Sequence, residues 1–149
     1  GTVKNTTGTT AGTIRNMGAT VVSQANTLAY TDTSAKQMFV LPAGAQILSF
    51  TVDATTAFNS GTNNVITISD PSGNSLATVT ATSANITLGR ATVAVTGAQI
   101  AEYVNVGSTD FIVSAVFAGT GTAATTGAAT ITCQYVVRNS DGSANPASA

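Results

Sequence analysis

The sequence is most informative at Val65-Ile66-Thr67-Ile68-Ser69-Asp70-Pro71-Ser72-Gly73, where an alternating β-strand runs into a tight turn. A type I turn favours Asp at its first position, Pro at its second and Gly at its fourth, and all three are present. The chain beyond the turn is again rich in β-branched residues. We therefore expect Val65–Ser69 and Ser75–Ala81 to form a β-hairpin, with Asp70 serving the turn.

Working outward, the clearest strand covers residues 45–54, where large apolar residues recur at every second position. One row is Leu48, Phe50, Val52 and Ala54, and the other is Ile47, Ser49, Thr51 and Asp53. A period of two is the signature of a strand with one face buried. We expect the row bearing Phe50 to face the core, where Phe50 and Phe117 are the predicted anchors.

The same reasoning predicts about eight strands, at 13–23, 37–41, 45–54, 64–69, 75–81, 91–96, 110–117 and 129–137. Residues 98–104 are expected to form one helical turn or a loop, with Ile100 and Tyr103 tucked beneath it. Short strands at this spacing are typical of a sandwich or barrel, and eight strands in two Greek keys make a jelly roll. The predicted fold class is all-β. It is a single jelly-roll-like β-sandwich with an extended N-terminal arm (1–12), a sandwich domain (13–139) and a flexible C-terminal tail (140–149).

Composition supports this fold class and excludes several kinds of function. Only 7 % of the 149 residues are charged, against roughly 25 % in an average soluble domain, and Thr and Ala fill the difference. The chain has no His and one Cys, so the usual general base, the commonest zinc ligand and an internal disulfide are all missing. A net charge of −1 with five scattered cations argues against a nucleic-acid surface. We expect no enzyme activity and no cofactor.

A membrane segment is also not expected. The longest uncharged run, residues 111–137, contains three Gly and six Thr, whereas a spanning helix needs about 20 mostly apolar residues.

A few polar residues are candidates for a site. Asp53, Asp70 and Asp110 could offer oxygen ligands to calcium, but their spacing matches no loop motif, and turn or strand-end roles are favoured. Cys133 lies on a strand row with Ile131 and Tyr135, which predicts a buried, inert thiol. Glu102 is the only Glu in the chain and is expected to face solvent. No metal site is predicted.

A family resemblance lies in the order of four segments. They are Phe39-Val40-Leu41-Pro42-Ala43-Gly44-Ala45, then Thr55-Thr56-Ala57-Phe58-Asn59 with Ile66-Thr67-Ile68-Ser69-Asp70, and finally the Gly/Thr/Ala-rich run 121–132. This order resembles small capsid decoration (cement) proteins of tailed bacteriophages over residues 37–137. The resemblance implies a jelly-roll-like sandwich, a homotrimer, and binding to the outside of the icosahedral head, with the major capsid protein as partner.

Candidate interface residues follow from the arm and from the arginines. The N-terminal arm is interpreted as a capsid contact, and Arg is favoured at interfaces for its bidentate bonds to carboxylates. The candidate capsid or subunit contacts are Val3, Lys4, Ile14, Arg15, Arg90 and Arg138. The function predicted is a structural virion protein on the outer capsid surface that cements neighbouring capsid subunits. The alternative is a receptor- or glycan-binding β-sandwich, such as a head fibre or adhesin module, although sugar platforms need exposed aromatic rings and the chain has no Trp.

Overall fold

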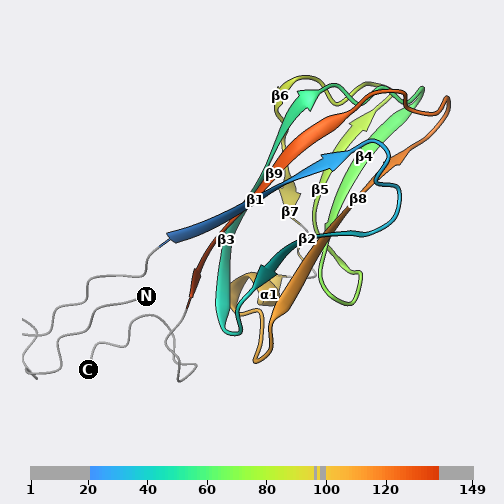
Figure 1. Ribbon diagram of the computed structural model, residues 1–149. Coiled ribbons are helices and arrows are strands. Elements are labelled where there is room, and N and C mark those ends of the chain that lie inside the picture. Colours follow the sequence, from blue (N-terminus) through green and yellow to red (C-terminus); the bar gives the residue numbers. More distant parts are fainter. Residues whose placement is uncertain (1–20, 96, 98–99, 138–149) are drawn as a thin grey trace, which may run out of the picture.

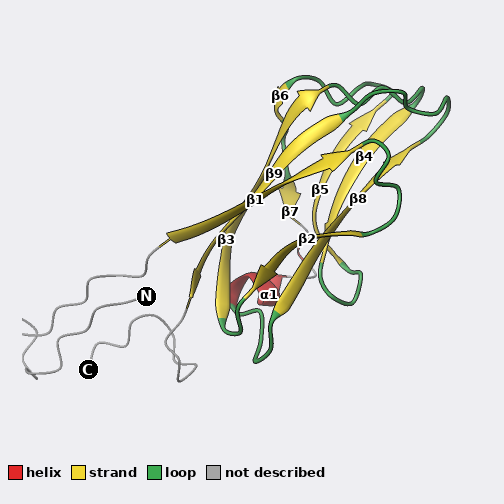
Figure 2. Ribbon diagram, viewed as in Figure 1, coloured by secondary structure: helices red, strands yellow, loops and turns green. Residues whose placement is uncertain are grey.

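Two antiparallel β-sheets pack face to face in the computed structural model, which describes residues 21–95, 97 and 100–137 (Figures 1 and 2). The first sheet has the order β1-β9-β3-β6 and the second the order β2-β8-β4-β5-β7. The strands are β1 (Val21–Ala29), β2 (Lys36–Leu41), β3 (Ala45–Thr56), β4 (Asn63–Ser69), β5 (Ser75–Thr82), β6 (Gly89–Arg90), β7 (Ala94–Val95), β8 (Phe111–Gly119) and β9 (Ala128–Val137). A five-residue helix, α1 (Ile100–Val104), lies between β7 and β8.

The pairing of the strands is nested along the chain. β4 pairs with β5, β3 with β6, β2 with β8 and β1 with β9, all antiparallel. A long hairpin wrapped into two sheets gives this order, which is that of a jelly roll. The all-β sandwich expected from the sequence is therefore confirmed, with nine strands among the described residues because two short strands occupy the region between β5 and α1.

The predicted hairpin turn is present between β4 and β5. The Gly73 amide donates to the Asp70 carbonyl oxygen at 3.0 Å, and Gly73 has a φ of +86°, which a side chain would disfavour. The Asp70 carboxylate also accepts the amides of Ser72 and Asn74, both at 2.8 Å. This local bonding explains why Asp70 is buried without a cation beside it.

The core lies between the sheets and is built from alternate residues of the long strands. Phe50 and Phe117 are both buried, as predicted, and Phe50 meets the ring of Tyr103 edge-on with centroids 6.0 Å apart. The prediction for Leu48 is wrong, since its side chain is 44 % exposed. A β-bulge between Ile47 and Ser49 inserts Leu48 as an extra residue, so that Ile47 faces inward instead.

Three other expectations need correction. The first described strand runs to Ala29 rather than ending at Ser23, because residues 24–29 pair with β9 even though several of them are polar. Of the strand expected at 91–96, residues 94–95 form β7, whereas residues 91–93 connect it to β6 of the other sheet. In α1, Tyr103 is buried as expected, but Ile100 is 57 % exposed.

The predicted arm (1–12), residues 13–20 of the predicted first strand, and the tail (140–149) lie outside the described residues. Within the described ranges, no helix has the length and apolar character needed to cross a membrane.

Candidate interface surfaces

The outward face of the five-stranded sheet carries no charged side chain. Its positions follow from the register, since each outward residue pairs with another: Val40 with Ile112, Thr67 with Val116 and Thr78, and Val65 with Ala118 and Thr80. We call this surface the neutral face. Its members are Gln37, Val40, Val65, Thr67, Ser69, Thr78, Thr80, Thr82, Ala94, Ile112, Ser114, Val116 and Ala118.

The neutral face is nearly all β-branched or small, and its hydroxyl groups are the main polar atoms. Val40 and Ile112 are 39 % and 40 % exposed, so the pair forms an apolar patch at the β2 end of the face. Covering hydroxyl groups costs far less than covering unpaired charges, provided that the partner supplies hydrogen bonds. Such a face suits a large contact with another protein. The outward positions of β4, β5 and β8 contain no charged residue, so the neutral face is encoded in the sequence. Identifying those positions, however, requires the strand register.

The four-stranded sheet differs from the neutral face because it carries an ion pair. Asp53 on β3 faces Arg90 on β6, and the guanidinium makes two contacts with the carboxylate, one of them from Nη2 to Oδ2 at 3.0 Å. The hydrogen bond from Arg90 holds the pKa of Asp53 below its usual value. The guanidinium of Arg90, a candidate contact residue, thus binds a carboxylate of its own chain. Its part in an intersubunit contact stays a prediction. Val3, Lys4, Ile14, Arg15 and Arg138 lie outside the described residues.

One side of the sandwich is closed by side chains that run from β1 to β2. Gln24 Nε2 donates to the Val40 carbonyl oxygen at 2.9 Å, and Asn26 Nδ2 donates to the Met38 carbonyl oxygen at 3.3 Å. Lys36 Nζ donates to the Thr27 carbonyl oxygen at 2.7 Å while pairing with Asp32 at 3.0 Å. Carbonyl groups that an edge strand would offer to another chain are therefore already occupied here.

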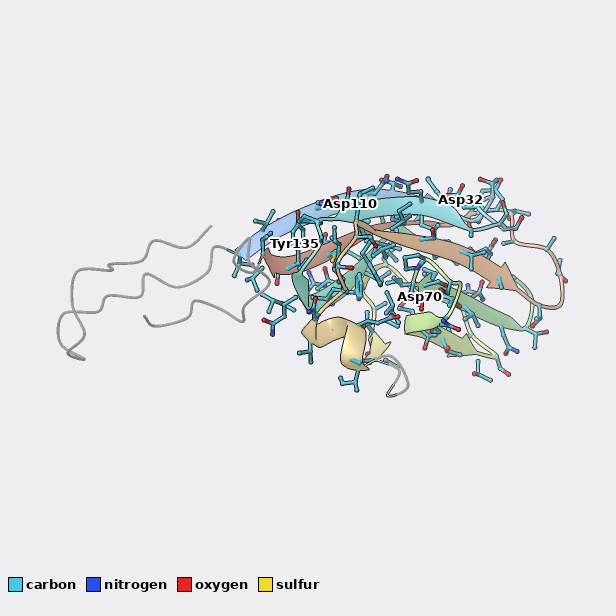
Figure 3. The ribbon with its side chains drawn as sticks, turned by 90° about the horizontal axis from the view of Figure 1, so that it is seen from below. Asp32, Asp70, Asp110 and Tyr135 are labelled. Atoms are coloured by element: carbon cyan, nitrogen blue, oxygen red, sulfur yellow. The ribbon has the colours of Figure 1, made fainter. Side chains whose placement is uncertain are left out.

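Two carboxyl groups meet where α1 approaches the β4–β5 turn, and Figure 3 labels one of them, Asp70. Burial, the negative charge of Asp70 and a hydrogen bond to it raise the pKa of Glu102 above its usual value. Burial works against ionisation of Asp70, but hydrogen bonds from Asn74, Glu102 and Ser72 outweigh it and lower its pKa. Glu102 Oε2 is buried without a hydrogen-bond partner. The expectation that Glu102 faces solvent is therefore wrong, because the short helix turns it toward Asp70.

The remaining candidate groups are Cys133 and Asp110. Burial raises the pKa of the Cys133 thiol to about 12, so the thiol is protonated at neutral pH. Asp110, also labelled in Figure 3, is exposed at the start of β8. In the part of the chain that the structure describes, no three His, Cys, Asp or Glu side chains are grouped closely enough to hold a metal ion.

A shallow apolar cleft of about 300 Å³ lies at the loop end of the sandwich, beside Tyr30 and Thr33. Tyr30 is the only aromatic residue of the chain that is not buried, and all eight aromatic residues are described. The Tyr135 hydroxyl, for example, is held inside the sandwich by a hydrogen bond from Gln24 at 2.9 Å. A flat stacking platform of several rings, as sugar recognition needs, is not formed by these residues.

Comparison with solved structures shows a likeness in fold. No family model matches the sequence, and no curated protein matches it. A chain in a solved structure described as "Cyanophage Pam1 capsid asymmetric unit" aligns with a TM-score of 0.53 and 17 % sequence identity. The alignment covers 83 % of this chain and 89 % of that chain. At this identity the likeness concerns the fold, and it includes most of both chains.

Proposed function

We propose that the protein is a structural component of a tailed-phage virion that binds the outer surface of the capsid and cements neighbouring capsid subunits. The observation that carries the proposal is the shared fold with a chain of a cyanophage capsid asymmetric unit over most of both chains. The decoration role rests on the resemblance of residues 37–137 to cement proteins, and so does the homotrimer. No enzymatic step, cofactor or nucleic acid is part of the proposal.

The neutral face is the surface that we assign to the capsid. It extends over all five strands of its sheet, and docking it buries no unpaired charge. Hydrogen bonding then falls to the Thr and Ser hydroxyls, which can act as donors or acceptors and adapt to the shell. Val40 and Ile112 supply apolar area at one end.

Cementing follows from mass action. A protein that binds only the assembled shell stabilises that shell by RT ln(1 + [L]/Kd), about 2.7 kcal/mol per site when its free concentration is 100 times Kd. No chemistry at the site is needed. Shells that carry the protein should therefore release their contents at a higher temperature than bare shells.

The test uses two matched variants of the full chain. Ile112→Lys adds a charge to the neutral face, and Leu48→Lys adds one to the opposite sheet at a residue of similar exposure, 44 % against 40 %. Bare phage shells are mixed with each protein, and bound copies and heat-release temperature are measured. We expect wild type and Leu48→Lys to bind and stabilise the shells, and Ile112→Lys to bind at least tenfold more weakly.

Each other outcome has a definite meaning. Equal loss in both variants would refute the choice of face. Shells that bind the protein yet release at the same temperature would refute cementing. If wild-type protein binds no shell and is absent from purified virions by mass spectrometry, the virion role is wrong, and the receptor- or glycan-binding alternative is then tested on a glycan array with Tyr30→Ala as control.

A further inference from the structure

The edge of the five-stranded sheet at β5 is open along half its length. β7 pairs with β5 only at Ala77 and Thr78. Residues 79–82 pair with β4 on one side, and no described hydrogen bond joins them to another segment on the other side. Unpaired backbone groups on an edge strand form a template for another extended chain.

A cleft runs beside this open edge. Its walls are residues 79–81 of β5 on one side and residues 90–92 on the other, with residues 85–87 between them, and its volume is about 270 Å³. Val79 and Ile86 supply buried apolar surface. The far wall is fixed, because the Ala91 amide donates to the Val52 carbonyl oxygen at 2.8 Å. The one charge in the lining, Arg90, is paired with Asp53.

The β2 edge, on the other side of the same sheet, is partly bonded already. There the β2 carbonyls accept hydrogen bonds from the β1 side chains Gln24 and Asn26. The two sides thus differ within one molecule. At β2 two carbonyl groups accept hydrogen bonds from amide side chains, whereas β5 keeps four residues without a second strand partner, with a cleft beside them.

Residues 1–20 have the chemistry that the open edge requires. They contain no Pro, so each of residues 2–20 can donate a backbone N–H, and seven of the twenty are Thr, which favours strands, beside Val3 and Ile14. Their only charges are Lys4 and Arg15. The described residues carry five carboxylates and two cations, a formal charge of −3, so the arm and the body attract.

The position of β1 decides which copy supplies the arm. β1 lies beside β2, which is at the opposite edge of the five-stranded sheet from β5 and β7. Twenty extended residues span at most about 70 Å, ample to reach a neighbouring molecule. A chain's own arm would have to wrap around its own body, whereas an arm passed to the next copy makes a heterologous contact that closes a ring in a trimer.

We infer that an N-terminal segment from residues 1–20 of one copy adds as a β-strand to residues 79–82 of a second copy, covering the cleft. This contact is independent of capsid binding and needs no virion to test. It gives the trimer a physical basis that the sequence resemblance alone does not.

Disulfide trapping in the protein that carries residues 1–20 tests this contact. Cys133 is buried and protonated, so introduced thiols react without interference. One protein carries Thr80→Cys at the open edge, and a series of partners carries single cysteines in the arm, at Thr6, Thr7, Thr9, Thr10 and Thr13. Thr55→Cys, an exposed position near the end of β3, is the matched control for Thr80→Cys.

On mixing under mild oxidation we expect disulfide-linked dimers between an arm variant and Thr80→Cys, at least fivefold above the yield with Thr55→Cys. Along consecutive arm positions the yield should alternate, because successive side chains of a strand point to opposite faces. Equal yields at both body positions would overturn the inference. So would a disulfide that forms only within one chain bearing both cysteines, which would show that the chain's own arm covers the edge. Either result leaves capsid binding to be judged by the shell experiment.

Discussion

Replacing Glu102 by Gln should stabilise the protein at neutral pH. In the folded chain Glu102 and Asp70 are in contact, and burial together with the charge of Asp70 raises the pKa of Glu102. The ionised form is therefore disfavoured by folding. A Gln side chain has nearly the same shape and carries a permanent N–H donor toward the Asp70 carboxylate, so it forms the hydrogen bond without needing a proton.

The sign and pH window of the effect follow from linkage. A group whose folded pKa lies above its unfolded value contributes stability below the unfolded pKa, and this contribution is lost as pH rises through the folded pKa. Wild-type protein thus keeps the Glu102–Asp70 hydrogen bond in acid and loses it toward pH 7. Glu102→Gln keeps it throughout, so the difference between the two proteins should appear at pH 7 and vanish toward pH 4.

The magnitude is modest because Glu102 is only partly buried. A hydrogen bond to a charged group contributes about 1.5–3 kcal/mol when well shielded, and solvent screening at this site reduces the expected gain to about 1 kcal/mol. For a chain of this length that is a rise in Tm of about 2–4 °C. Thermal melts at pH 7 and pH 4, followed by circular dichroism, measure it.

The control is Asp110→Asn, which removes one negative charge from an exposed residue and should shift Tm much less. A Tm at pH 7 that is unchanged or lower in Glu102→Gln would refute the carboxyl contact. A gain of equal size at both pH values would refute the role of ionisation, since packing alone would then explain it.

Three further predictions concern the core. Truncating Phe50 or Phe117 to Ala should each cost about 3–5 kcal/mol in the free energy of unfolding by urea, and an unchanged midpoint would show that the ring is not in the core. Gly127→Ala should cost at least about 2 kcal/mol more than Gly73→Ala, because both glycines have positive φ but an added Cβ at Gly127 would lie 2.3 Å from the Phe58 ring, whereas that at Gly73 meets open space. Cys133 should react with a thiol reagent at pH 8 only on unfolding, since burial raises its pKa to about 12, and fast labelling of native protein would contradict its burial.

Much of the sandwich is predictable because it depends on local patterns. The turn at Asp70–Gly73 needs only its own four residues and brings β4 beside β5. Phe111, Val113, Ala115 and Phe117 alternate in the sequence and are all buried on one face of β8. In both cases the physical cause acts between residues that are close in the chain.

The sequence-based predictions are wrong where contacts between residues distant in the chain determine the local structure. Nothing near Leu48 marks a bulge, and the inward turn of Ile47 is fixed by its pairing with Tyr135 on β9. Residues 24–29 are too polar to predict a strand, yet Gln24 and Asn26 reach the backbone of β2, which is not adjacent in the sequence. The meeting of Glu102 with Asp70 likewise depends on how α1 docks, so the sequence offers no sign of it.

The low number of charged residues limits how this chain can protect the edges of its sheets. Many proteins guard sheet edges with lysine, which keeps other strands away by charge. This chain has only five cations in 149 residues, so few are available for that role. On the β1–β2 side, neutral amide side chains bind the exposed carbonyl groups instead. Amide sealing needs a partner strand within reach, and residues 79–82 of β5 have none beyond the two-residue β7. Residues 79–82 and the neutral face are therefore the two surfaces that the proposed contacts with a second copy and with the capsid would cover.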